Sequence, residues 1–160
     1  MADYPIVLVW PTDTVCKVVQ GFGIEDTDPE YLPLYRSLGY LAHNGYDIAP
    51  RDSIPPGIKP VYASTPGIVT VQYNDPTAGN FVILEHPQVR TRYLHLHGNP
   101  LVVTGQEVNS GQLLGFMGNS GLAEGVHLHW DVRPAEYDFQ NGYKGLVSPG
   151  HYWIKFRVAA

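Results

Sequence analysis

The sequence predicts an all-β fold, an antiparallel sheet or sandwich with long connecting loops and at most short helices. Seventeen glycines and fourteen prolines are spread along the 160 residues and divide the chain into many short elements, which argues against a helical bundle. Eleven tyrosines and several valine-rich runs favour strands. After position 57 apolar and polar residues alternate with a period of two, as they do in half-buried strands.

Strands are expected where β-branched and aromatic residues cluster between turn signals. Turn-forming residues at 75–79 and 87–88 join three of these runs into an antiparallel meander. The stretch 24–38 is acidic and then aromatic, and its prolines Pro29 and Pro33 limit any helix there to a turn or two. The expected strands are 5–10, 15–20, 68–73, 81–86, 90–96, 126–132 and 152–158.

Alternation assigns the side chains of these strands to opposite faces. In 126–132 one face carries Leu128, Trp130 and Val132, and the other carries His127, His129 and Asp131. In 90–96 one face is expected to carry Thr91, Tyr93 and His95, and the other Arg92, Leu94 and Leu96. In the last strand Tyr152, Ile154, Phe156 and Val158 alternate with Trp153, Lys155 and Arg157.

The composition limits the classes of partner. The chain has a net charge of −5, a pI of about 5.7 and no basic run, so we expect no nucleic-acid partner. No apolar run approaches the roughly 20 residues of a membrane-spanning helix, so we expect no membrane insertion. The length fits a single domain over 1–160, expected to be monomeric. The one cysteine, Cys16, allows no internal disulfide and is expected to be a small buried residue.

The chemistry is expected among the seven histidines, because imidazole is a common metal ligand and a proton carrier near neutral pH. His127 and His129 share a strand face, so they can bind one metal together, or one can bind it while the other acts on substrate. His43 and Asp47 can converge from a loop that leads into a strand. Together with one strand histidine they supply three nitrogen and oxygen ligands and leave a fourth position open, as a catalytic zinc site requires.

These segments together resemble the lysostaphin/LytM-type zinc metallopeptidases, which cut peptide bonds in bacterial peptidoglycan. The resemblance runs from about 20 to 132, the motif core, and 133–160 is expected to pack on this core as an extension. Residues 43–47 match the His-x-x-x-Asp motif of the family, and 125–130 match its His-x-His segment. The other matching segments follow in family order: 20–23, 60–63, 67–69, 79–86, 91–96, 105–108, 111–115 and 118–121.

The resemblance implies a role for each candidate residue. His43, Asp47 and His129 correspond to the zinc ligands, with one Zn²⁺ per chain. His95 and His127 correspond to the catalytic pair that holds and activates water. Asp131 stands where the family often has glutamate. The remaining candidates are Asn44, Tyr46 and His97 as groove-wall residues that contact substrate, His86 as a packed histidine and His151 as a surface residue.

The implied function is a zinc-dependent endopeptidase that hydrolyses peptide cross-links of bacterial peptidoglycan, a cell-wall lytic enzyme such as a phage lysin. The alternatives are a non-catalytic regulator that activates cell-wall amidases and a virion-associated lytic component. The partner is the peptide stem or cross-bridge, reached outside the cell or in the periplasm. The start of the chain lacks the basic region and cleavage site of a signal peptide, which suggests a phage lysin or a trimmed protein. Bond selectivity is expected in the loops 24–38, 73–79 and 119–125.

Overall fold

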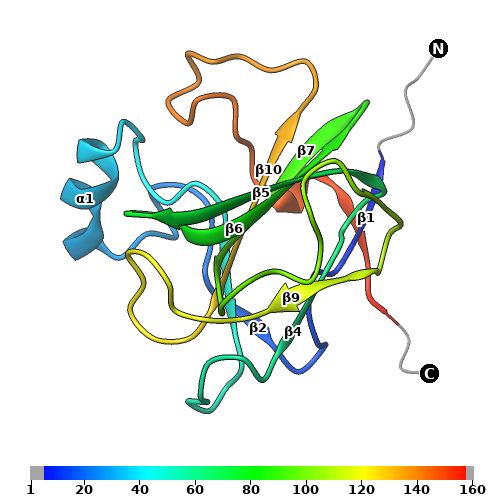
Figure 1. Ribbon diagram of the computed structural model, residues 1–160. Helices are drawn as coiled ribbons and strands as arrows, with labels where there is room; N and C mark the ends of the chain where they lie inside the picture. Colours follow the sequence, from blue (N-terminus) through cyan, green and yellow to red (C-terminus); the bar gives the residue numbers. More distant parts are fainter. Residues whose placement is uncertain (1–5, 158–160) are drawn as a thin grey trace.

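A seven-stranded antiparallel sheet forms the centre of the molecule (Figure 1), and this confirms the predicted fold class. The computed structural model describes residues 6–157, so the expectations for the chain start, for Pro5 and for Val158 lie outside the described residues. In spatial order the strands are β2 (Lys17–Gln20), β3 (Tyr46–Ala49), β10 (Leu128–Pro134), β7 (Val89–Leu96), β6 (Gly79–His86), β5 (Gly67–Asp75) and β8 (Glu107–Val108).

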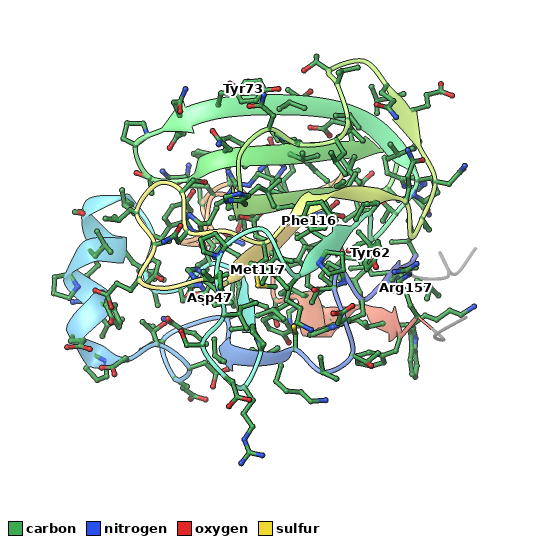
Figure 2. All side chains as sticks on the ribbon, turned by 60° about the horizontal axis from the view of Figure 1, so that its bottom comes forward. Asp47, Tyr62, Tyr73, Phe116, Met117 and Arg157 are labelled. Atoms are coloured by element: carbon green, nitrogen blue, oxygen red, sulfur yellow. The ribbon has the colours of Figure 1, made fainter. Side chains whose placement is uncertain are left out.

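Two small sheets lie against one face of this large sheet. Strand β1 (Val7–Val9) pairs in parallel with β11 (Trp153–Lys155), whereas β4 (Pro60–Tyr62) pairs antiparallel with β9 (Leu113–Phe116). The guanidinium of Arg157 stacks on the ring of Tyr62, 3.5 Å from its centroid, and so ties the end of the chain to β4 (Figure 2).

The helices are short, as the prolines in 24–38 require. A 3₁₀ turn, η1 (Pro29–Tyr31), runs into the six-residue helix α1 (Leu32–Ser37), and a second 3₁₀ turn, η2 (Pro149–His151), precedes β11. Helix α1 stands at one end of the molecule, away from β1 (Figure 1). Among residues 6–157, no helix has both the length and the apolar character needed to cross a membrane.

The hydrophobic core fills the space between the large sheet and the two small sheets. Leu128, Trp130 and Val132 of β10 are fully buried in it, while His129 and Asp131 lie on the opposite face, as alternation predicted. Cys16 is also fully buried there, and burial raises the pKa of its thiol. The opposite face of the sheet carries a small apolar cluster of Ala78, Phe81 and Leu94 with Ile83.

The predicted alternation at the end of the 90–96 strand was wrong for both His95 and Leu96. Tyr93 and Leu96 both lie in the main core, whereas Leu94 and His95 both line a cavity on the other face. The cause is the left-handed backbone of His95, with φ of 65°, where the register of β6 against β7 also shifts. Strict alternation stops at such an irregularity, so His95 joins the face of Leu94 rather than that of Tyr93.

We expect Tyr93→Phe to lower the free energy of unfolding by about 1–3 kcal/mol, because it leaves a buried donor unpaired. The fully buried Tyr93 hydroxyl accepts the Ser64 N–H at 2.7 Å and lies 2.9 Å from the Thr91 hydroxyl. Urea denaturation measures the loss. The matched control is Tyr73→Phe on the outer part of the sheet (Figure 2), where the side chain is 50% exposed. An equal loss in both variants would contradict this account.

Candidate metal centre

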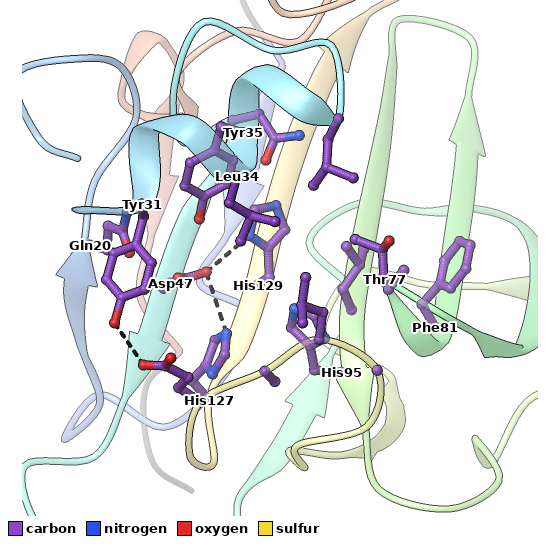
Figure 3. Close-up of a pocket in the computed structure, with 18 of the residues that line it drawn as sticks. Gln20, Tyr31, Leu34, Tyr35, Asp47, Thr77, Phe81, His95, His127 and His129 are labelled. Atoms are coloured by element: carbon purple, nitrogen blue, oxygen red, sulfur yellow. Dashed lines mark hydrogen bonds and ion pairs between the residues drawn. The ribbon is translucent and has the colours of Figure 1, made fainter. Parts of the chain in front are cut away.

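Three donor atoms converge where β3 pairs with β10, on the sheet face away from the core. His129 and Asp47 are direct partners in the register of the two strands, and His43 stands four residues before Asp47. His129 Nδ1 lies 2.9 Å from Asp47 Oδ1, and His43 Nε2 lies 3.1 Å from Asp47 Oδ1 and 3.2 Å from His129 Nδ1. Figure 3 shows Asp47 facing the imidazole of His129. The sequence candidates for metal ligands are therefore brought together.

The spacing of these atoms fits a metal ion. A tetrahedral site with metal–ligand bonds of about 2.0–2.1 Å holds its ligand atoms about 3.3 Å apart, close to the 2.9–3.2 Å found here. Both histidines are buried, while the Asp47 side chain is 14% exposed toward the cavity. Two imidazoles and one carboxylate form the donor set of a transition-metal site with one side left open.

Backbone contacts decide which nitrogen of His43 faces the centre. Its Nδ1 lies 2.6 Å from the carbonyl oxygen of Gly21. Because a carbonyl only accepts, Nδ1 carries the hydrogen and Nε2 presents its lone pair to the site. The backbone N–H of His43 donates to the Thr27 hydroxyl at 3.0 Å, which anchors the loop before β3.

The charges around Asp47 and His129 are strongly coupled. Burial alone would raise the pKa of Asp47, but hydrogen bonds and the charges of His129 and His43 hold it well below its usual range. Burial alone would lower the pKa of His129, but the neighbouring carboxylates of Asp131 and Asp47 raise it to about 9. An ionised carboxylate thus lies at the centre of the cluster.

His95 and His127 lie side by side at the edge of this centre, with ring centroids 4.9 Å apart (Figure 3). His95 Nδ1 donates to the Ser120 carbonyl at 2.8 Å, so Nε2 is its free acceptor. Burial, followed by the charges of His129 and His127, lowers the pKa of His95 to about 4. Burial also lowers the pKa of His127, whose Nε2 lies 3.6 Å from Asp47 Oδ1. Both shifts favour the neutral ring, which can accept a proton.

The five residues lie at an open cavity of about 680 Å³, lined by all of them except the buried His43. The loops 24–38, 73–79 and 119–125 all contribute to its walls, and Phe81 and Leu94 contribute an apolar part. Two of these loops meet where the Tyr31 hydroxyl donates to Glu124 Oε2 at 2.6 Å (Figure 3). The cavity is therefore shaped by the segments in which the sequence analysis expected selectivity to reside.

The candidate groove-wall residues divide into two groups. Asn44 lines the cavity, whereas Tyr46 and His97 do not. Tyr46 precedes Asp47 on the strand, so it points to the core face and packs against Trp130, 6.3 Å between ring centroids. His97 follows the backbone reversal at His95 and lies against Gly57. A role for Tyr46 or His97 in the groove is therefore not supported by their positions.

The histidines outside the centre lie at the surface or near it. His86 is half-buried at the end of β6, and its Nδ1 accepts the Gln88 N–H at 3.2 Å. His151 is exposed in η2. Neither residue lines the cavity.

Two residues that the sequence analysis did not select support the site. A Cβ atom on Gly45 would lie 2.6 Å from the Trp130 carbonyl oxygen and 2.8 Å from His129 Nε2. Ser120 Oγ donates to the Leu96 carbonyl at 2.7 Å and accepts the Asn80 N–H at 3.0 Å. Its own carbonyl orients His95. For Gly45 the available signal was its place between His43 and Asp47. Ser120 lies in the matching segment 118–121, but nothing in that segment indicated its role.

A histidine–aspartate–histidine centre with one side open, beside two further histidines, has the donor set of a catalytic metal site. Residues 41–141 match the model of Peptidase family M23, and the chain belongs to this family. The expected resemblance to lysostaphin/LytM-type peptidases is thereby confirmed.

Relatives of known name agree with this assignment. The chain is 38% identical over 125 residues to the peptidoglycan DD-endopeptidase ShyA of Vibrio cholerae, an alignment that covers 77% of this chain and 26% of ShyA. A crystal structure of a zinc-containing peptidase from Vibrio cholerae is similar with a TM-score of 0.64 and 32% identity, over 84% of this chain and 41% of that one. The chain spans about a quarter of the length of ShyA.

The fold is also that of lysostaphin from Staphylococcus simulans. Its catalytic domain aligns with a TM-score of 0.62 and 24% identity, over 84% of this chain and 90% of that one. At 24% identity this similarity shows the fold alone.

We expect Gly45→Ala to weaken metal binding about 10–100-fold, the range found when the surroundings of a ligand are disturbed. The added methyl group would push His129 away from Asp47. Titration with Co²⁺, followed by visible absorption, measures the affinity. The control is Gly115→Ala, whose Cβ would make an ordinary contact of 3.5 Å with Pro100. Equal affinity in both variants would show that the space at Gly45 is not needed.

Proposed function

We propose that this chain is a zinc-dependent endopeptidase that hydrolyses peptide cross-links of bacterial peptidoglycan. The observation that carries the proposal is the convergence of three donor atoms within 3.2 Å of one another, beside the adjacent rings of His95 and His127. Membership of the M23 family and the similarity to the DD-endopeptidase ShyA and to the zinc-containing peptidase support it.

His43, Asp47 and His129 would hold one Zn²⁺ through Nε2, an Oδ atom and Nδ1. When bound, zinc polarises a carbonyl oxygen and lowers the pKa of a water ligand to about 7. The carboxylate offsets part of the metal charge, and the two buried histidines keep the ligand set rigid. The exposed side of Asp47 faces the cavity, so a peptide can approach from there.

His95 and His127 are the catalytic pair in this proposal. Each ring has its Nδ1 directed at a backbone carbonyl, Ser120 for His95 and Gly125 for His127, so each Nε2 keeps its lone pair for the reaction. A neutral Nε2 can take a proton from the attacking water and return it to the leaving amine. Once protonated, it can also stabilise the negative charge that develops on the carbonyl oxygen.

The substrate would be the peptide stem or cross-bridge, bound as an extended chain in the cavity. The loops 24–38, 73–79 and 119–125 line the cavity and would select the bond. Such a substrate places the enzyme at the bacterial cell wall, outside the cell or in the periplasm. We propose that it acts as a monomer, with the metal ligands and the catalytic pair supplied by one chain.

We expect purified peptidoglycan to release new peptide fragments when treated with the protein, and His43→Ala to reduce their release by about 10³-fold or more. The reason is that a lost ligand removes several kcal/mol of metal-dependent stabilisation. Mass spectrometry of the fragments identifies the bond. His97→Ala is the matched control. His97 does not line the cavity, so this variant should keep its activity.

The opposite result would change the assignment. If the protein binds zinc but leaves several wall types intact, the free lytic enzyme is ruled out. The amidase regulator or the virion component, which the sequence also allowed, would then be the next hypothesis.

We expect His95→Ala and His127→Ala to reduce turnover by about 10²–10⁴-fold, the usual contribution of a positioned acid or base. Both variants should still bind one zinc ion per chain, because neither residue is a ligand in the proposal. Fragment release and zinc content by atomic absorption are measured on the same samples. Loss of zinc from either variant would contradict the proposed division of roles.

A further inference from the structure

A buried ion pair lies directly behind the metal centre. Asp131 is fully buried on the groove face of β10, two residues after His129. Its carboxylate accepts hydrogen bonds from Arg92 Nε at 2.8 and 3.0 Å and from Arg92 Nη2 at 2.6 Å. The same carboxylate oxygen that binds Nη2 lies 3.3 Å from His129 Nε2. One carboxylate thus connects an arginine to a candidate metal ligand.

The strand register produces this contact. Arg92 of β7 is the direct partner of Asp131 in β10, so its long side chain meets the carboxylate in a two-pronged arrangement. His129 and Asp131 share a face because residues two apart on a strand point the same way. The carboxylate of Asp131 therefore lies beside the ring of His129.

The Nε2 atom of His129, on the side of the ring away from Asp47, lies beside the Asp131 carboxylate. His129 Nε2 is buried and, among residues 6–157, forms no hydrogen bond. Asp131 is the acceptor beside it. Gly45 closes the remaining space, since a Cβ there would lie 2.8 Å from Nε2 and 2.9 Å from Asp131 Cβ. Among residues 6–157, the Asp131 carboxylate is therefore the acceptor that lies beside Nε2.

We propose that Asp131 and Arg92 are positioning residues for the metal: Asp131 keeps the hydrogen of His129 on Nε2, and Arg92 holds Asp131 in place. A neutral imidazole has one lone pair, so a hydrogen on Nε2 leaves Nδ1 as the metal-binding atom. His43 achieves the opposite choice through the Gly21 carbonyl. A carboxylate partner also makes the imidazole a stronger donor to a metal. The inference rests on the proposed function, because it requires that His129 binds zinc.

The test is the zinc affinity of the full chain, measured by competition with a coloured chelator. We expect Asp131→Ala to raise the Kd about 10–100-fold, as for other partners of metal-binding histidines. The Kd of Asp131→Asn should lie between those of the unaltered protein and Asp131→Ala, because the amide oxygen accepts the hydrogen but carries no charge. Arg92→Met should also weaken binding, by a smaller factor, since Asp131 remains but is no longer held. Asp13→Asn, which breaks the surface pair with Lys59 at 3.0 Å, is the charge-matched control and should bind as the unaltered protein does.

A second readout separates positioning from a general loss of structure. The visible spectrum of bound Co²⁺ reports the geometry of its ligands, and it should change in Asp131→Ala but not in Asp13→Asn. The double variant Arg92→Met with Asp131→Ala removes both buried charges, so it folds without an unpaired ion even where the single variant fails. Circular dichroism checks the fold, and the double variant should lose as much zinc affinity as Asp131→Ala.

The outcomes are distinct. A Kd within twofold of the unaltered value and an unchanged Co²⁺ spectrum, in folded Asp131→Ala or in the double variant, would overturn the positioning role while the proposed enzyme stands. Failure of the unaltered protein to bind zinc would overturn the proposed function and this inference together.

Discussion

The pairing of β3 with β10 is the constraint on which the site depends. It places Asp47 directly opposite His129 on the groove face and Ile48 opposite Leu128 in the core. A slip of one residue would turn the carboxylate into the core and the apolar side chains toward the cavity. The burial of Leu128 and Ile48 therefore holds the register, and with it the distances between the metal-binding atoms.

Asp47, His95 and His129 lie on strands, and the selective walls lie on loops. Asp131, two residues after His129 on β10, and its partner Arg92 on β7 extend the polar network along the sheet. The loop around Ser120 is tied to two strands through its hydroxyl and to His95 through its carbonyl. Loop variation can then alter the cavity without moving the donor atoms.

Local patterns predicted the sheet well and failed where the backbone departs from a regular strand. Alternation placed His129 and Asp131 opposite Trp130 correctly, because β10 is regular through these residues. It failed at His95, because a positive φ reverses the face and no alternating pattern signals such a reversal. Whether His97 reaches the groove depends on the same irregularity, so its exclusion from the cavity lining was not visible in the sequence.

The sequence by itself determined the class of fold, the family and the residue types available for a metal centre, since these follow from period, motif order and spacing. Only the tertiary structure decided which atoms meet. The choice of Nδ1 in His129 and Nε2 in His43 follows from Asp131 and the Gly21 carbonyl, partners set by strand register and loop path. The need for a glycine at 45 arises in the same way, since its neighbours come from β10. Such contacts join residues far apart in the chain, and no local pattern encodes them.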